Sequence, residues 1–96
     1  MPQFLLLAED FTDDEALNRR LAVRETHLAH LREVKANGTL EFAGARLSAE
    51  DKMIGSVVVI NAADEKEALE IFKQDPYYAG KVWDKMQVTP IRVAKL

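Results

Sequence analysis

The chain has 96 residues, of which 48% are hydrophobic and 30% charged, as in a folded soluble protein of one domain, residues 1–96. The net charge is −3 and no basic cluster occurs, which argues against nucleic acid and against a membrane surface as partners. Cysteine is absent, which excludes disulfides and thiolate metal sites and agrees with a cytoplasmic location.

A strand and a long helix are predicted first. Residues 4–8 form an apolar run of strand length, too short for a signal peptide or a membrane span. The helix is expected to begin at Thr12, which can cap it, with Glu15 as the capping-box partner and three acids in its first turn. It ends at Ala36, because the following Asn37-Gly38 is a typical helix stop.

The long helix has an apolar stripe formed by Leu17, Leu21, Leu28 and Leu31. Helical spacing places Arg24 near the middle of this stripe and His27 at its edge, whereas His30 points toward solvent. An inward Arg24 indicates either a kink near Val23 or a side chain that serves a pocket. The two histidines are therefore distinguished, with His27 beside the buried face.

The second half of the chain predicts strands at residues 39–44, 54–60 and 83–93 and a helix that begins after Asp64. A second capping box, Asp64 with Glu67, starts this helix, and Pro76 stops it. Its predicted core face is Ala68, Leu69 and Phe72. Residues 45–53 and 77–80 are expected to be loops, and Pro90 indicates an edge position or a bulge in the last strand.

The order β-α-β-β-α-β predicts an α+β, ferredoxin-like fold, with a four-stranded antiparallel sheet and two helices on one face. The other sheet face would be bare, with Phe42, Val58 and Met86 as candidates to line it. A bare apolar face on so small a domain is best covered by a second copy. The sequence therefore predicts a homodimer.

Several ordered motifs carry a resemblance to the YciI-like (YCII-related) family, namely Val23-Arg24-xx-His27-Leu28, Gly38-x-Leu40, Ala43-Gly44, Gly55-Ser56, Asp75-Pro76-Tyr77 and Val88-x-Pro90. The resemblance spans nearly the whole chain. It implies a dimeric α/β-barrel type of ferredoxin-like fold and an active site centred on a histidine and an aspartate. Carried onto this sequence, these are His27 and Asp75. The chemistry that the family implies is lyase-like, such as chloride elimination from a chlorinated aromatic diol or quinol.

The chain departs from the family pattern at Gly44-Ala45, where the family usually has Gly-Pro, and the loop of residues 45–53 is short. Both differences lie where a substrate pocket would be shaped. The resemblance therefore does not transfer a substrate class.

The predicted catalytic residues are His27, as acid–base, and Asp75, which would orient the imidazole and stabilise its charged form. The structural alternative is a helix-edge histidine bonded to backbone and an aspartate that caps the turn before Pro76.

The predicted substrate-binding residues are Arg24, Ser56 and Tyr77. Arg24 could hold a ligand carboxylate or phenolate, or else form a salt bridge or extend its charge outward. Tyr77, with Tyr78 and Trp83, could wall an aromatic pocket, although a small core is the preferred reading for Trp83. Ser56 could donate to a ligand, although a Gly55-Ser56 pair within a strand more often marks a bulge or a close backbone approach.

No metal site and no cofactor are predicted. His27 and His30 diverge around the helix and lack a third ligand, and no Gly-rich phosphate loop or nucleophile elbow occurs. RNA binding on the sheet is set aside, because residues 54–60 contain no aromatic side chain.

The leading functional hypothesis is a homodimer that binds a small aromatic or hydroxylated molecule, with a lyase- or isomerase-type proton transfer at His27. The alternative is a non-catalytic module that binds a metabolite or a protein in the same cleft.

Overall fold

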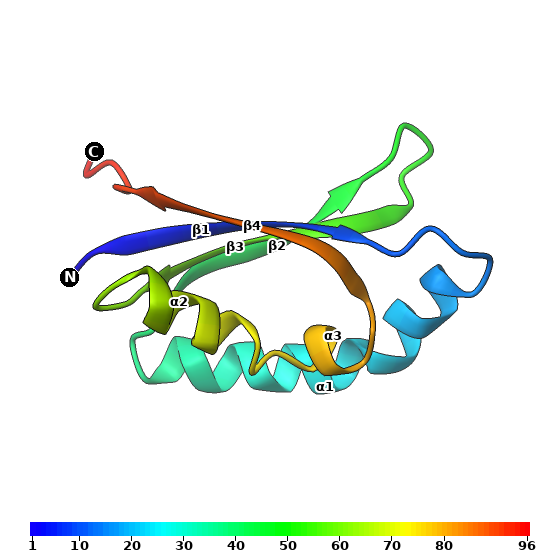
Figure 1. Cartoon of the computed structure of the whole chain (residues 1–96), viewed down its shortest axis with the longest axis horizontal. Coiled ribbons are helices and arrows are strands. Elements are labelled where there is room, and N and C mark those ends of the chain that lie inside the picture. Colours follow the sequence, from blue (N-terminus) through cyan, green and yellow to red (C-terminus); the bar gives the residue numbers. More distant parts are fainter.

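The computed structural model describes residues 1–96 as a four-stranded antiparallel sheet with three helices on one face (Figure 1). In chain order the elements are β1 (Gln3–Asp10), α1 (Ala16–Ala36), β2 (Leu40–Leu47), β3 (Met53–Asn61), α2 (Glu65–Phe72), α3 (Pro76–Ala79) and β4 (Trp83–Ile91). The strand order is β2-β3-β1-β4. The predicted ferredoxin-like class is confirmed, with α3 as an additional short helix.

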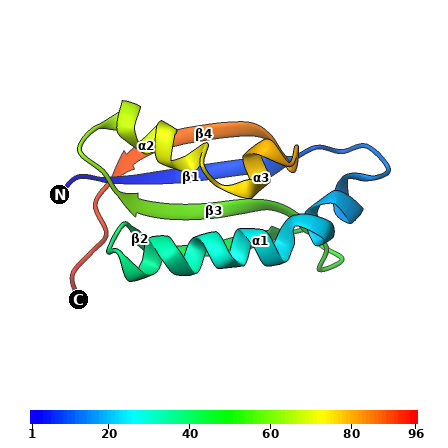
Figure 2. The same ribbon diagram turned by 90° about the horizontal axis from the view of Figure 1, so that it is seen from below.

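The helices divide the covered face of the sheet between them. α1 lies along the β2 and β3 side, and α2 and α3 lie along the β1 and β4 side (Figure 2). Strand β4 is an edge strand, paired only with β1, and it tolerates Pro90 because an edge strand leaves one row of backbone groups unpaired. None of the helices is both long and apolar enough to cross a bilayer.

The period of two along the central strand β1 decides which side chains face the helices. Phe4, Leu6 and Ala8 are buried. Their partners on the neighbouring strand β3 are Ile60, Val58 and Ser56, respectively. Met86 on β4 lies opposite Ala8 and shares this covered face. Two of the predicted open-face residues, Val58 and Met86, therefore belong to the helix side, and that prediction is wrong for them.

The open face is nonetheless apolar. Phe42 lies there, opposite Val59, and is 51% exposed, as predicted for a residue of the bare face. Its apolar neighbours on the same face are Leu5, Leu7, Val57 and Val59.

Helix α1 begins at Ala16, later than the predicted start at Thr12. Thr12 provides no cap. Asp13 instead accepts a hydrogen bond from the Glu15 N–H at 3.2 Å and forms an ion pair with Arg19 at 2.8 Å. The acids thus precede the helix and do not occupy its first turn. The hydrogen bonds from the Arg19 guanidinium lower the pKa of Asp13 to about 2, so the ion pair persists above that pH and is lost in stronger acid.

The face of α1 that was predicted to be buried is wrong, because the helix is rotated about its axis relative to that prediction. Its fully buried residues are Ala16, Arg20 and His27, whereas Leu17 and Leu21 are 36% and 51% exposed. Arg24 is also exposed, and the helix continues without a break past Val23, so Arg24 does not lie on the buried face. His30, expected in solvent, is half-buried. The reason is that Arg20 and His27 find buried polar partners, which no leucine could satisfy.

The later elements follow the sequence more closely. The Asp64 side chain accepts from the Glu67 N–H at 2.8 Å, which confirms the cap of α2, but Leu69 is 36% exposed and outside the core face. Residues 76–79 form α3 where a loop was predicted, because the Asp75 side chain caps them and Pro76 is suited to a first helical position. β2 extends to Leu47, which shortens the predicted loop.

Candidate functional site

His27 and Asp75 meet in the interior, although 48 positions separate them in the chain. The His27 Nδ1 atom lies 2.7 and 2.9 Å from the two carboxylate oxygens of Asp75, and both residues are buried. Asp75 is held in an extended conformation before Pro76, and its Oδ1 also accepts the Tyr77 N–H at 2.9 Å. The carboxylate therefore both caps α3 and contacts the imidazole.

This contact determines the form of the imidazole. A carboxylate can only accept hydrogen bonds, so Nδ1 carries the hydrogen that points at Asp75. In the neutral ring Nε2 then holds the lone pair and is the basic nitrogen. The Asp75 carboxylate also stabilises positive charge on the ring, the arrangement that a general base requires.

Two aromatic rings immobilise the imidazole. Tyr77 stacks on His27 with ring centroids 3.8 Å apart and planes at 11°, and the edge of Trp83 packs against both rings. Tyr77 is 1% exposed. His27 therefore has one orientation, fixed by Asp75 at its Nδ1 and by Tyr77 at its face.

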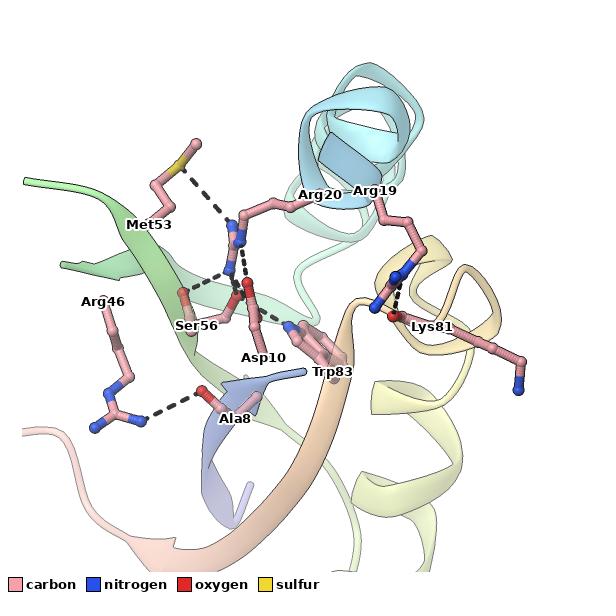
Figure 3. Close-up of polar contacts among 10 residues, drawn as sticks. Ala8, Asp10, Arg19, Arg20, Arg46, Met53, Ser56, Lys81 and Trp83 are labelled. Carbon is pink, nitrogen blue, oxygen red and sulfur yellow. Dashed lines mark hydrogen bonds and ion pairs between the residues drawn. The ribbon is translucent and has the colours of Figure 1, made fainter. Parts of the chain in front are cut away.

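Arg20 lies two helical turns before His27 and is the most deeply buried charge of the site. Its Nε donates to Asp10 at 2.7 Å, and its Nη2 donates to the Gly55 carbonyl and to Ser56 Oγ. Figure 3 shows the guanidinium among Asp10, Ser56 and Met53, with Trp83 directed at the same serine. The guanidinium carbon also lies 4.6 Å from the Tyr77 ring centroid.

Arg20 and Asp10 were not among the predicted site residues, yet the sequence contained a signal for each. Ala16, Arg20, Val23 and His27 repeat at helical spacing, and Asp10 continues the alternation that buries Ala8. The signal for Arg20 competes with the stripe of leucines on the neighbouring face of the helix.

A cavity of about 180 Å³ opens between α1 and the β2–β3 hairpin. Its polar lining consists of Arg20, Arg24, His27, Ser56 and Tyr77, and its apolar wall comes from α1, β2 and Met53. Four of the five predicted site residues thus line one cavity, and Asp75 contacts His27 from outside the lining. Arg24 is exposed at this cavity. The functional roles of these residues stay predictions.

The two aromatic candidates other than Tyr77 do not line this cavity. Tyr78 is 41% exposed, and Trp83 is buried and packs in the core, as the preferred reading of the sequence had it. The close backbone approach expected at Gly55 is present, because a Cβ atom there would lie 2.3 Å from the Ala8 carbonyl oxygen. No group of three or more histidine, cysteine or acidic side chains converges on a common point.

Burial raises the pKa of the Tyr77 hydroxyl above its ordinary value of 10.0, although the charges of Arg20 and Arg24 act in the opposite direction. Tyr77 is therefore a protonated phenol throughout the neutral range.

The model of the YCII-related domain matches residues 3–92. The chain belongs to the YCII-related domain family. Within it, the chain is 34% identical over 90 residues to the derivative of benzaldehyde biosynthesis cluster protein C of Emericella nidulans, covering 85% of this chain and 92% of that protein. It is 30% identical over 95 residues to an uncharacterized protein of Haemophilus influenzae, covering 93% and 95%.

Among solved structures, 5-chloro-2-hydroxyhydroquinone dehydrochlorinase (TftG) of Burkholderia phenoliruptrix AC1100 superposes with a TM-score of 0.81. The match covers 96% of this chain and 95% of that one, at 23% identity. The likeness shows a shared fold. Membership of the YCII-related family, predicted from the ordered motifs, is confirmed.

Replacing Tyr77 by Phe should make the free energy of unfolding depend less on pH in the alkaline range. The pKa of Tyr77 is raised in the folded protein, so the side chain ionises at a lower pH when the chain is unfolded. The contribution of the protonated Tyr77 to stability is therefore complete below pH 10 and is lost as the pH rises toward the pKa of the folded state. The wild-type free energy of unfolding should then fall more steeply than the variant's, by about 1.4 kcal/mol per pH unit between the two pKa values. Urea unfolding from pH 7 to 12 measures this. Tyr78→Phe is the matched control, and equal slopes for wild type and Tyr77→Phe would contradict the prediction.

Replacing Asp75 by Ala should change the tautomer of His27. The wild-type neutral ring is expected to carry its hydrogen on Nδ1, because Asp75 accepts it there. Without the carboxylate, the Nε2–H form should increase. Nitrogen-15 NMR shifts of the two ring nitrogens report this directly, with His30 as the internal reference. An Nε2–H ring in the wild type would exclude the arrangement described above.

Proposed function

We propose that the chain binds a small hydroxylated or quinonoid ring in the 180 Å³ cavity and moves a proton on it with His27. The observation that carries the proposal is that His27 lines this cavity with Nδ1 occupied by Asp75. Nε2 is thereby left as the basic atom, in a ring that cannot rotate without breaking its stack on Tyr77.

The roles follow from the contacts. His27 Nε2 would accept a proton from a hydroxyl or an acidified C–H of the ligand, and Asp75 would stabilise the imidazolium that forms. The same proton can then return to another ligand atom, which is an isomerisation, or its departure can accompany loss of a leaving group, which is a lyase step. Arg24, which forms no ion pair within the chain, would attract an anionic oxygen.

The cavity size supports a one-ring ligand. Pockets for drug-sized molecules span roughly 300–1,000 Å³, and this cavity is smaller. Its lining combines polar side chains with the apolar surface of Leu28 and Leu31, which suits the polar edge and the apolar face of a hydroxylated ring.

The comparisons support the same ligand class. The dehydrochlorinase TftG is described in complex with 2,5-dihydroxybenzoquinone, and the Emericella relative is named for a benzaldehyde biosynthesis cluster. Both descriptions concern substituted aromatic or quinonoid rings.

A binding module without chemistry is the second candidate. Every contact described above would equally well position a bound ligand, and a buried His–Asp pair can be structural. Binding and turnover must therefore be measured separately.

The test uses 2,5-dihydroxybenzoquinone as the binding probe and 5-chloro-2-hydroxyhydroquinone as the turnover probe. We expect wild type to bind the first and to release chloride from the second. His27→Gln should lower turnover by about 10²- to 10⁴-fold, the usual contribution of a general acid–base group, and should change binding much less. Calorimetry and chloride release measure the two properties.

The matched control is His30→Gln, one turn along the same helix and outside the cavity lining, which should behave as wild type. Binding without chloride release by wild type would favour the binding module. Absence of binding would exclude the proposed ligand class.

We also propose that two copies pair through the open face of the sheet. Apolar side chains line this face, where the exposed Leu7 and Phe42 lie beside the half-buried Leu5 and Val57. Glu9 and Arg46 on the same face supply opposite charges near one end. Burying this face against an identical one removes apolar surface from water, and charged residues at its end can pair across a two-fold axis.

Placing a charge on this face should separate the copies. Phe42→Asp is expected to be monomeric at micromolar concentration where wild type is dimeric, because the carboxylate would be buried without a partner. Light scattering after gel filtration measures the mass. Leu21→Asp is the matched control, since Leu21 is also 51% exposed but lies on α1. A monomeric wild type would refute the pairing.

A further inference from the structure

Ser56 lies at the centre of a buried hydrogen-bond cluster beside the cavity. Its Oγ accepts from Arg20 Nη2 at 2.7 Å and from Trp83 Nε1 at 3.0 Å. The residue is 3% exposed and lines the cavity together with Arg20, whose hydrogen bond to the serine is drawn in Figure 3. Both donors are themselves buried, and neither can act as an acceptor.

The two incoming bonds restrict what the serine can offer. A hydroxyl has two acceptor lone pairs and one hydrogen, and both lone pairs are already occupied. The remaining hydrogen-bonding capacity of Ser56 is its O–H. A serine hydroxyl normally rotates about its Cβ–Oγ bond, so it can either donate a hydrogen bond to a partner or accept one. Ser56 can act toward a ligand only as a donor.

Arg20 supplies a second donor next to it. Its Nε and Nη2 are occupied by Asp10, Gly55 and Ser56, whereas Nη1 has a hydrogen bond to the Met53 sulfur, which is long at 4.0 Å. A thioether is a weak acceptor, so an oxygen atom would compete well for these N–H groups. Met53 lines the same cavity.

Resting on the proposed function, we propose that the Ser56 hydroxyl and Arg20 Nη1 form a donor-only subsite that binds an oxygen atom without hydrogen, a ring carbonyl or a phenolate of the ligand. The paired charges of Asp10 and Arg20 keep the subsite close to neutral, so it accepts an uncharged quinone carbonyl as well as an anion. A hydroxyl would be disfavoured, because its oxygen is a weaker acceptor than a carbonyl or phenolate oxygen and its hydrogen would find no acceptor in the subsite.

The subsite also suits the proton transfer. When His27 Nε2 takes a proton from a saturated carbon next to the carbonyl, as in the keto tautomer of a hydroxylated ring, the C–H electron pair forms a carbon–carbon double bond and the carbonyl π pair moves onto the oxygen. The resulting enolate oxygen would lie between two donors that are already oriented and desolvated. Such preorganised donors stabilise developing negative charge without reorganisation.

The test compares two probes with the same carbon and oxygen framework, 2,5-dihydroxybenzoquinone and 1,2,4,5-tetrahydroxybenzene, titrated anaerobically by calorimetry. Wild type should prefer the quinone. Ser56→Ala should weaken quinone binding about tenfold and tetrahydroxybenzene binding less than about twofold, because only the quinone oxygen needs the lost donor. Ser48→Ala, a serine of the β2–β3 turn, is the matched control and should leave both affinities unchanged.

Trp83→Phe tests whether Ser56 is restricted to donating because both of its lone pairs are occupied. The variant removes the Trp83 Nε1–H donor, so one lone pair of Ser56 Oγ becomes free to accept from a ligand hydroxyl. The ratio of the affinities for the quinone and for tetrahydroxybenzene should therefore become smaller. This variant retains Ser56 and decides the question if Ser56→Ala does not fold. Thermal unfolding of each variant is measured alongside.

The outcomes separate the two proposals. If wild type binds both probes equally, or if Trp83→Phe leaves the preference unchanged, the donor-only subsite is wrong while the proposed ring binding stands. If wild type binds neither probe, the proposed function fails, and the subsite fails with it.

Discussion

The burial of Arg20 is the constraint on which the site depends. A guanidinium in the interior requires a charged partner and several acceptors, since an unpaired charge there would be strongly destabilising. Asp10 at the end of β1, the Gly55 carbonyl and Ser56 on β3 supply them. These bonds join α1 to the two central strands and set the rotation of the helix about its axis.

That rotation places His27. With Arg20 directed at the sheet, the residue two turns later on α1 also faces inward, and it meets Asp75 before the short helix α3. Asp75 is bound on its other side by the Tyr77 backbone, and the Tyr77 ring stacks on the imidazole. The site thus combines residues from three distant parts of the chain, and each buried side-chain nitrogen and oxygen has at least one hydrogen-bond partner.

The strand positions were predicted well from the apolar runs, which are local properties of the chain, but the phase was wrong at Val58 and Met86. Capping motifs located the end of α1 and the N-cap of α2, where the responsible side chains are within a few residues of each other. Helical periodicity failed for the rotation of α1. Leu17, Leu21, Leu28 and Leu31 form an apolar stripe beside the one that is buried, and choosing between them needs the position of Asp10 on another element.

The sequence by itself determined the order of the four strands and the two longer helices, the family, and the two residues His27 and Asp75 as candidates, because each of these is carried by local spacing or by ordered motifs. Only the tertiary structure showed that Arg20, and not Arg24, is the buried cation. It also showed that Ser56 accepts two hydrogen bonds, which leaves its O–H as a hydrogen-bond donor for a ligand. The physical reason is that a hydrogen-bond inventory depends on which groups meet across the core. Those partners lie on different elements, 10 to 36 residues apart along the chain, where spacing carries no information about contact.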